Sequence, residues 1–169
     1  MMTVTLNHER ANEVLSYDAE TGLFLWRVGR GGTAKGAVAG SKSVAGYVQI
    51  KFDRKFYYAH RVAWLLIHGR WPSHHIDHIN GVRDDNRLAN LRECSAGQNQ
   101  QNRGRSSNNA SGYTGVSFHS LVDKWQAHIQ INGLRSHLGY FQNSEDARAA
   151  YLAAKAQFHK FNPVIRSAA

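Results

Sequence analysis

The spacing of apolar residues along the chain predicts a series of short elements that alternate between helical and strand periods. A short helix follows Asn7, a residue type that caps helices well. Apolar residues at 62, 63, 65, 66 and 67 predict a buried helix, closed by Gly69 and stopped by Pro72. The other elements expected in the first hundred residues are strands at 23–27, 47–52, 55–58, 76 and 91–94, loops at 29–43 and 80–90, and a helix at 95–102. The strands at 47–52 and 55–58 flank Asp53-Arg54 and are expected to form a hairpin.

Beyond Gly112 the apolar residues alternate with polar ones and then take up a helical period. Strict alternation gives a strand one apolar and one polar face. The apolar face holds Val116, Phe118, Trp125, Ala127, Ile129 and Leu138, and the polar face holds Ser117, His119, Gln126, His128, Gln130, Arg135 and His137. One stripe of the helix that follows is formed by Ala147, Ala150, Tyr151, Ala154 and Phe158. The pattern predicts a three-stranded antiparallel sheet packed on one helix.

The charge of the chain favours a polyanionic partner. Its 169 residues include 21 Lys and Arg against 12 Asp and Glu, a formal net charge of +9. Nucleic acid is the commonest partner of so basic a protein, ahead of a membrane surface. Basic residues gather between Arg27 and Arg61, where Asp53 is the only acidic residue. The side chains expected to contact DNA from this region are Arg27, Arg30, Lys51, Arg54 and Lys55.

Cysteine usage and hydropathy exclude several classes of protein. The single cysteine, Cys94, excludes an intrachain disulfide and a zinc site built from paired thiols, and we expect it to be buried. The longest apolar run, residues 62–67, is too short to cross a bilayer, and the first residues lack the apolar core of a signal peptide. We therefore expect a cytoplasmic protein with no membrane partner.

The most informative chemistry lies in residues 77–81, which read Asp-His-Ile-Asn-Gly. Metal-assisted hydrolysis of a phosphodiester needs a divalent metal at the phosphate and a base that deprotonates the attacking water. Asp77 supplies a metal ligand and His78 a base. Neighbouring residues of an extended segment point to opposite sides, so the two side chains can serve the metal and the water separately.

Other polar residues near this pair have simpler interpretations. Asn80, Asp85 and Asn86 belong to the residue types that form turns, and we expect them to satisfy the backbone of a long loop. His74 and His75 precede the pair, and we expect them to form an exposed polar pair, although His75 lies on the side of Asp77 in an alternating strand.

These residues together resemble the HNH endonucleases, in particular the homing type encoded by phages and introns. The resemblance covers roughly residues 5–103. It is carried by His60-Arg61-Val62-Ala63-Trp64, Gly69, Trp71-Pro72, Asp77-His78-Ile79-Asn80-Gly81, Asp85-Asn86-Arg87-Leu88, Asn90-Leu91-Arg92 and Asn99. It implies a ββα-metal site in which His78 is the general base, Asp77 and Asn99 bind the metal, and Asn90 braces the loop that aims His78.

Asn99 stands where the pattern that gives the family its name has a histidine. An amide oxygen and the Asp77 carboxylate make a site rich in oxygen, so the resemblance implies Mg²⁺ or Mn²⁺ in preference to zinc. A surface position for Asn99 stays open as an alternative, because the same expected helix carries further amides at Gln98, Gln100, Gln101 and Asn102.

The C-terminal residues 112–162 resemble the DNA-binding domain of plant ethylene-response factors, the Apetala-two type. The resemblance is strongest at Gly112-Tyr113, Gly115-Val116, Trp125, Ala127, Ile129, Leu138-Gly139 and the Ala-rich helix. The plant domain reads DNA with Arg and Trp, whereas most of those places here hold Ser117, His119, His128, Gln130 and His137. The resemblance implies that the polar face, together with Lys124, docks on double-stranded DNA, while a half-buried sheet with a plain polar surface is the alternative.

The sequence thus predicts an α+β protein, with N-terminal antiparallel strands and a ββα-metal core followed by a three-stranded sheet on one helix. The expected boundaries are 1–59 for a basic, β-rich region that contacts DNA, 60–103 for the nuclease core, 104–111 for a flexible basic linker and 112–163 for the second DNA-binding domain. The expected function is metal-dependent cleavage of double-stranded DNA at a recognised site by a monomer with no obligate protein partner, which the resemblance makes phage-encoded and active in a bacterial host.

Two other functions compete with this one. The first is a sequence-specific DNA-binding regulator that keeps the nuclease scaffold without using it. The second, RNA binding, is the weaker, because the base-stacking motifs of the common single-strand RNA modules are not evident.

Overall fold

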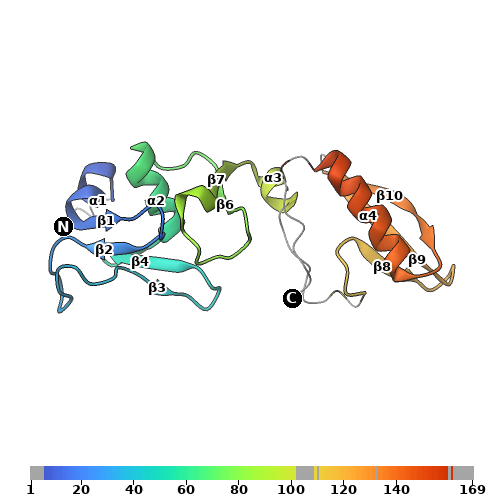
Figure 1. The fold of residues 1–169 in the computed structure, drawn as a ribbon, viewed down its shortest axis with the longest axis horizontal. Coiled ribbons are helices and arrows are strands. Elements are labelled where there is room, and N and C mark those ends of the chain that lie inside the picture. Colours follow the sequence, from blue (N-terminus) through green and yellow to red (C-terminus); the bar gives the residue numbers. More distant parts are fainter. Residues whose placement is uncertain (1–5, 102–108, 110, 132, 160, 162–169) are drawn as a thin grey trace. The chain divides into compact units, whose positions relative to one another are not determined.

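The computed structural model describes residues 6–101, 109, 111–131, 133–159 and 161, and its chain divides into two compact units, Met1–Ser95 and Ala96–Ala169 (Figure 1). The elements of the first unit are α1 (His8–Val14), β1 (Leu15–Tyr17), β2 (Phe24–Trp26), β3 (Ser41–Lys42), β4 (Val48–Phe52), β5 (Lys55–Tyr58), α2 (Ala59–His68), β6 (His75–His78), the 3-10 helix η1 (Leu88–Asn90) and β7 (Leu91–Cys94). Those of the second are α3 (Ala96–Gln101), β8 (Val116–His119), β9 (Lys124–Ile131), β10 (Leu134–Phe141) and α4 (Ser144–Phe158).

Both helices predicted near the start of the chain are confirmed, and their ends have the expected causes. The side chain of Asn7 accepts a hydrogen bond from the backbone N–H of Arg10 at 2.9 Å and so caps α1. Gly69 ends α2 in the left-handed region, with φ of 71°, where a residue without Cβ costs least.

The first unit holds three small antiparallel sheets, ordered β1–β2, β3–β4–β5 and β6–β7. The predicted hairpin is confirmed as β4 and β5, joined by Asp53 and Arg54 with φ of 45° and 66°, as the tight hairpin turns require. The segment 29–43, expected to be a loop, ends in β3, and its Ala37 and Ala39 bond to the backbone of β2. Backbone pairing of this kind leaves no periodic pattern in the sequence, which also explains why β1 was not predicted.

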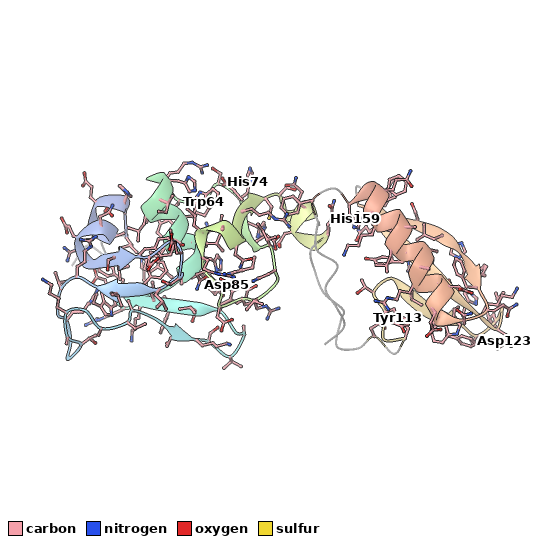
Figure 2. All side chains as sticks on the ribbon, viewed as in Figure 1. Trp64, His74, Asp85, Tyr113, Asp123 and His159 are labelled. Carbon is pink, nitrogen blue, oxygen red and sulfur yellow. The ribbon has the colours of Figure 1, made fainter. Side chains whose placement is uncertain are left out.

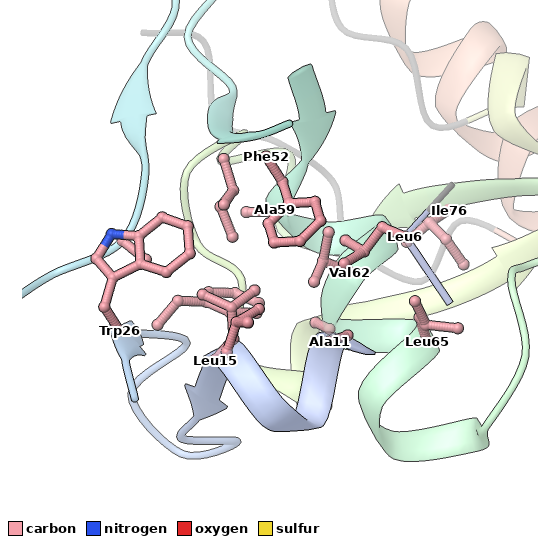
Figure 3. Close-up of a cluster of buried hydrophobic side chains, with 14 of the residues drawn as sticks. Leu6, Ala11, Leu15, Trp26, Phe52, Ala59, Val62, Leu65 and Ile76 are labelled. Atoms are coloured by element: carbon pink, nitrogen blue, oxygen red, sulfur yellow. The ribbon is translucent and has the colours of Figure 1, made fainter. Parts of the chain in front are cut away.

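One hydrophobic core joins the helices and sheets of the first unit (Figure 3). Its members come from α1, β1, β2, β4, α2, β6 and β7, and include Leu15, Phe24, Phe52, Val62 and Ile76. Residues before and after position 60 therefore fold around the same core. The strand β6, which carries Asp77 and His78, and its partner β7 pack on elements contributed by the first sixty residues.

In the second unit α4 packs on a sheet with the order β10–β9–β8. The buried residues are Val116, Ala127, Ile129, Ala147, Tyr151 and Ala154, as the alternating and helical patterns predicted. The prediction is wrong for Phe118, which is 49% exposed, and for Phe158, which is 45% exposed at the end of α4. The helix ends there, and the next residue, His159, is buried instead, with its Nε2 bonded to the carbonyl of Gln130 at 2.7 Å (Figure 2).

A β-bulge in β10 changes which side chains share the polar face. Pairing with β9 shifts between His137 and Gly139, so that Tyr140 lies opposite Gln126. Period-two counting from His137 places Tyr140 on the apolar face, whereas the extra residue of the bulge turns it to the polar face. The pattern alone could not reveal this aromatic residue.

Some expectations fall on residues outside the described ranges. Most of the linker expected at 104–111 and the last residues of the expected C-terminal domain lie there. Within the described ranges, none of the helices has the length and apolar content that a membrane span requires.

The hairpin β4–β5 offers a matched pair of substitutions that tests the core. Phe52 is 1% exposed and Phe56 is 61% exposed on the opposite face. We predict that Phe52→Ala lowers the free energy of unfolding by about 3–5 kcal/mol, because it removes a buried ring and leaves a cavity. Phe56→Ala should cost less than about 1 kcal/mol. Urea unfolding of both variants checks this, and equal losses would contradict the described core.

Candidate active site

His78 lies at the end of β6, where the strand enters the long loop that leads to β7. It pairs with Leu91 across the β6–β7 ladder, and its carbonyl accepts a hydrogen bond from Gly81 at 2.8 Å in the turn that follows. Its side chain is buried, with 6% exposure. The imidazole is therefore held in the interior of the unit at the point where a polar loop begins.

Asp77 is the neighbour of His78 in β6 and is also buried. It lies directly opposite Arg92 of β7, whose Nε and Nη2 donate to the same carboxylate oxygen at 3.0 and 2.8 Å. A charge-assisted pair of this kind compensates a buried carboxylate and fixes its orientation. The geometry gives Asp77 a defined direction beside the imidazole.

The His78 ring has a polar partner in Asn86. Nε2 of His78 lies 3.3 Å from Oδ1 of Asn86, and Asn86 donates from Nδ2 to the carbonyl of Asp84 at 3.2 Å, which fixes the orientation of the amide. The oxygen can only accept, so the proton of the neutral ring is on Nε2 and Nδ1 is the unprotonated nitrogen. Asn86 was expected to be a turn residue that only satisfies backbone. That expectation is incomplete, because its side chain is 2% exposed and faces His78.

The environment of His78 keeps its imidazole neutral near pH 7. Burial lowers the pKa of His78 and outweighs the hydrogen bond to Asn86 and the charges of Asp77, Asp85 and Asp84, which raise it. A neutral imidazole is the form that accepts a proton, so the site favours a base over an acid.

Two aromatic rings contact His78, and a third stacks on one of them. His60 meets His78 edge-on with ring centroids 5.0 Å apart, Tyr47 lies at 5.9 Å, and Tyr58 stacks on His60 at 5.4 Å. His60 thus packs between Tyr58 and His78. Burial first, and then the charges of His78 and Arg61, lower the pKa of His60 to about 3, and its buried Nδ1 has no hydrogen-bond partner.

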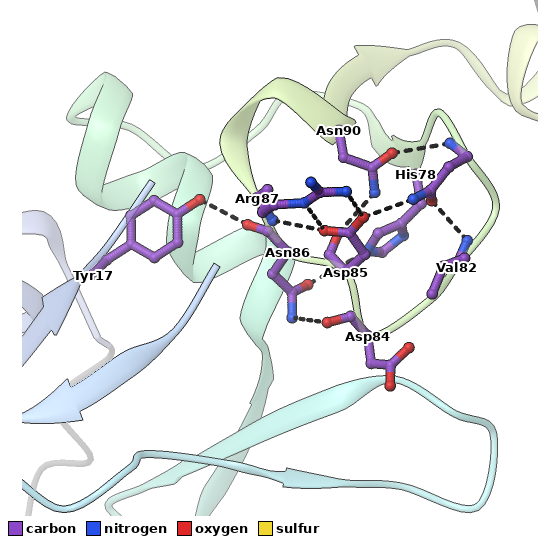
Figure 4. A network of polar contacts seen from close by, with 9 residues as sticks. Tyr17, His78, Val82, Asp84, Asp85, Asn86, Arg87 and Asn90 are labelled. Atoms are coloured by element: carbon purple, nitrogen blue, oxygen red, sulfur yellow. Dashed lines mark hydrogen bonds and ion pairs between the residues drawn. The ribbon is translucent and has the colours of Figure 1, made fainter. Parts of the chain in front are cut away.

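The loop from residue 80 to residue 90 is braced by Asn90 (Figure 4). Asn90 accepts from the backbone N–H of Asn80 at 2.9 Å and donates to the carbonyl of Asp85 at 2.8 Å, so it ties the start of the loop to its middle. Asp85 is bonded by Arg87 and Asn80, and the Arg87 contact holds the pKa of Asp85 at about 2. With these partners, Asp85 is a loop residue, as expected.

The N-terminal hairpin β1–β2 holds the same loop from outside. The hydroxyl of Tyr17 donates to the carbonyl of Asn86 at 2.7 Å (Figure 4). The N–H of Leu88 donates to the carbonyl of Ala19 at 2.9 Å. A Cβ on Gly22 would lie 2.6 Å from backbone atoms of Asn86 and Arg87. These contacts join residues far apart in the chain, so they could not be predicted from the spacing of residues in the sequence.

The side chains suited to a metal are few. Within the described parts of the chain, no group of three or more His, Cys, Asp and Glu is arranged to hold a metal ion. Asp77 offers a carboxylate beside His78, while Asn99 lies on α3 in the second unit, so the pairing of these two ligands stays a prediction. His74 and His75 are exposed, as expected. Mg²⁺ commonly takes one or two protein oxygens and completes its shell with water and phosphate, a donor demand that Asp77 fits.

The basic residues of the first unit that were expected to contact DNA differ in how many contacts they make within the protein. Lys51, Arg54 and Lys55 are exposed on β4, β5 and the turn between them. Arg27 is exposed but bonds through Nε to the carbonyl of Leu15 at 2.8 Å. The Arg30 guanidinium packs over the rings of Trp26 and Phe52 and pairs with Asp53 at 3.2 Å. The guanidinium of Arg30 is thus engaged in contacts within the fold, which makes it less suited than Lys51, Arg54 and Lys55 to contact DNA.

The polar face of the second unit is formed as predicted by residues from three strands. Pairing across β8, β9 and β10 places on this face Ser117, His119, Lys124, Gln126, His128, Gln130, Arg135 and His137. Tyr140 joins them and contacts the rings of His119 and His137 at 5.6 and 4.6 Å. Arg135 lies 3.2 Å from Nδ1 of His128. The face presents donors and one guanidinium, and none of the residues named here is a carboxylate.

Comparison with known proteins gives one match. Residues 57–101 match the model of a family described as HNH endonuclease, a stretch that includes His60, Asp77, His78, Asn90 and Asn99. The match supports nuclease activity on DNA. No curated protein and no solved structure matches the chain.

The contact at Gly22 gives a sharp test of the brace on the loop. Gly22 and Gly36 have φ of 75° and 84°, but a Cβ on Gly36 would meet nothing within 4 Å. Alanine introduces backbone strain at both positions. The two variants therefore differ in the clash with the backbone of residues 86 and 87, which only Gly22→Ala introduces. We predict that Gly22→Ala lowers the free energy of unfolding by about 1–3 kcal/mol more than Gly36→Ala. Chemical denaturation measures both, and amide shifts of residues 84–88 should change only for Gly22→Ala.

The lowered pKa of the buried His60 predicts that the stability of the fold depends on pH. In the unfolded chain this imidazole is protonated below about pH 6.5, whereas in the folded protein it stays neutral down to about pH 3. The free energy of unfolding therefore decreases as the pH falls from about 6.5 towards 3. The part due to His60 is about 2 kcal/mol between pH 7 and pH 5. His60→Gln should remove that part of the slope, and His68→Gln, at an exposed position, should keep it. Unfolding at the two pH values decides, and identical slopes in wild type and His60→Gln would contradict the burial of His60.

Proposed function

We propose that the protein is a metal-dependent DNA endonuclease of the HNH homing type, on the premise of the family match over residues 57–101. The observation that carries the proposal is the buried, neutral His78, oriented by Asn86 and adjacent to Asp77. A base with a lowered pKa beside a fixed carboxylate is the arrangement that hydrolysis of a phosphodiester needs.

In the proposed reaction His78 accepts a proton from water at Nδ1, the nitrogen that lacks one when Nε2 is bonded to Asn86. The resulting imidazolium is steadied by that hydrogen bond and by the charges of Asp77, Asp84 and Asp85, the same contributions that raise the pKa of His78. Asn90 keeps the loop closed around the ring. The products would be 5′-phosphate and 3′-hydroxyl ends.

Asp77 and Asn99 would hold the divalent metal, Mg²⁺ or Mn²⁺, because both offer hard oxygen ligands. When bound, the metal would polarise the phosphate and stabilise the leaving oxygen. Arg92 contributes by orienting the Asp77 carboxylate through two hydrogen bonds. A substitution at Arg92 should therefore weaken metal-dependent activity without touching the base.

The second unit would position the enzyme on double-stranded DNA. Its polar face combines the Arg135 guanidinium with imidazole and amide donors, in keeping with the resemblance to the Apetala-two domain, and a surface of donors suits the major groove. Burial, and then the charges of Arg135 and His137, lower the pKa of His128, so this imidazole stays neutral at physiological pH. We infer that His128 acts there as a neutral group beside the Arg135 charge.

The competing function is a DNA-binding regulator that keeps the scaffold unused. Both functions require the basic surfaces, so binding does not separate them. Cleavage does, because only the nuclease needs His78 neutral and aligned.

Incubation of supercoiled plasmid with the protein and Mg²⁺ or Mn²⁺ tests the proposal. We predict that His78→Ala lowers the cleavage rate by at least about 100-fold, the usual contribution of a general base, and leaves DNA affinity unchanged. His74→Ala, at an exposed position four residues away, should cut like wild type. A chelator should stop wild-type cleavage. Wild-type protein that binds DNA and never cuts would support the regulator, and His78→Ala that cuts at full rate would refute the proposed base.

A further inference from the structure

The hairpin β4–β5 has one buried and one exposed face, and the exposed face is aromatic. Ile50 and Phe52 point into the core, and Lys51 lies directly opposite Phe56 on the other side. Gln49 pairs with Tyr58 in the same way. We call the surface formed by Tyr47, Gln49, Lys51, Phe56 and Tyr58 the aromatic face.

Two rings of the aromatic face are open to solvent. Phe56 is 61% exposed and Tyr58 is 41% exposed, although the core beneath the hairpin is closed and well packed without them. Their exposure is not forced by a shortage of buried positions, because Phe52 and Tyr57 of the same two strands do pack on the core. Two exposed aromatic rings on one strand surface therefore offer a site for a ligand with flat apolar faces.

The charge around these rings is positive. The Lys51 ammonium lies 5.5 Å from the centre of the Phe56 ring, and the Arg83 guanidinium lies 5.1 Å from that of Tyr47. Arg54 and Lys55 are exposed in and after the turn. The nearby acidic residues, Asp53 and Asp84, are paired with Arg30 and Lys42 at 3.2 and 2.8 Å. Flat apolar rings among cations complement a nucleotide, which combines a base with a phosphate.

Tyr58 and Tyr47 connect the aromatic face with the candidate base. Tyr58 contacts Tyr47 with ring centroids 5.3 Å apart, and Tyr47 contacts His78 at 5.9 Å. His60 fills the angle between Tyr58 and His78. A strand laid along the aromatic face would therefore lead directly to His78.

We propose that the aromatic face binds an unpaired nucleotide of the DNA strand, with Phe56 stacking on its base and Lys51 contacting its phosphate. Bases inside a duplex are covered on both sides, so Phe56 can stack only on a base that is unpaired or displaced. The substrate of the proposed nuclease is then DNA with an unpaired stretch beside the scissile phosphate. The inference rests on the proposed function for the position of the cut, whereas binding to the aromatic face stands on its own.

Two duplexes that differ only in a central bubble of mismatched bases provide the probe. Binding is measured by fluorescence anisotropy at fixed salt in the His78→Ala protein without divalent metal, so that no cutting interferes. Base stacking on an aromatic ring contributes about 1–3 kcal/mol, so Phe56→Leu should weaken binding to the bubble by roughly 5- to 150-fold. Binding to the fully paired duplex should change by less than about 2-fold. Phe56→Trp should keep the affinity for the bubble, because it restores a ring.

Phe118→Leu is the matched control, since Phe118 is 49% exposed in the second unit and off the aromatic face. It should leave both affinities unchanged. If Phe56→Leu binds the bubble as tightly as the parent protein, or loses affinity equally for both duplexes, the proposal is overturned. If the face instead serves a protein partner, Phe56→Leu likewise leaves DNA binding unchanged. None of these binding measurements requires cleavage. The nuclease proposal is tested separately, by the plasmid assay with the wild-type protein.

Discussion

The contact between His78 and Asn86 is the interaction on which the rest of the site depends. It determines the tautomer of the imidazole, because an amide oxygen can only accept a hydrogen bond. Burial works in the opposite direction to the acidic neighbours and keeps the ring neutral. A base needs both conditions, an unprotonated nitrogen and a pKa below the working pH. If Asn86 moved, the buried neutral ring would still have one unprotonated nitrogen, but this contact would no longer fix it as Nδ1.

Asn86 is in turn held by the N-terminal hairpin, which lies outside the matched segment 57–101. Tyr17 bonds to its carbonyl, and Gly22 packs directly against its backbone. The core of the first unit likewise combines residues from both sides of position 57. The segment that carries the family pattern therefore depends on the preceding residues for its shape, and the two parts form one structural unit.

Local patterns in the sequence were enough to predict much of the fold. The cap at Asn7, the end of α2 at Gly69 and the hairpin turn at Asp53 each follow from neighbouring residues, and each is confirmed. The role of Asn86 and the outward position of Tyr140 could not be predicted. The first depends on contacts across most of the first unit, and the second on a bulge that breaks the period of its strand.

The state of the His78 ring tests this account most directly. Nitrogen-15 NMR of the imidazole, followed from pH 8 to pH 4, reports both the tautomer and the pKa. The account predicts the neutral form with its proton on Nε2 and a midpoint below the ordinary value of 6.5. A ring with its proton on Nδ1, or a midpoint at or above 6.5, would contradict it.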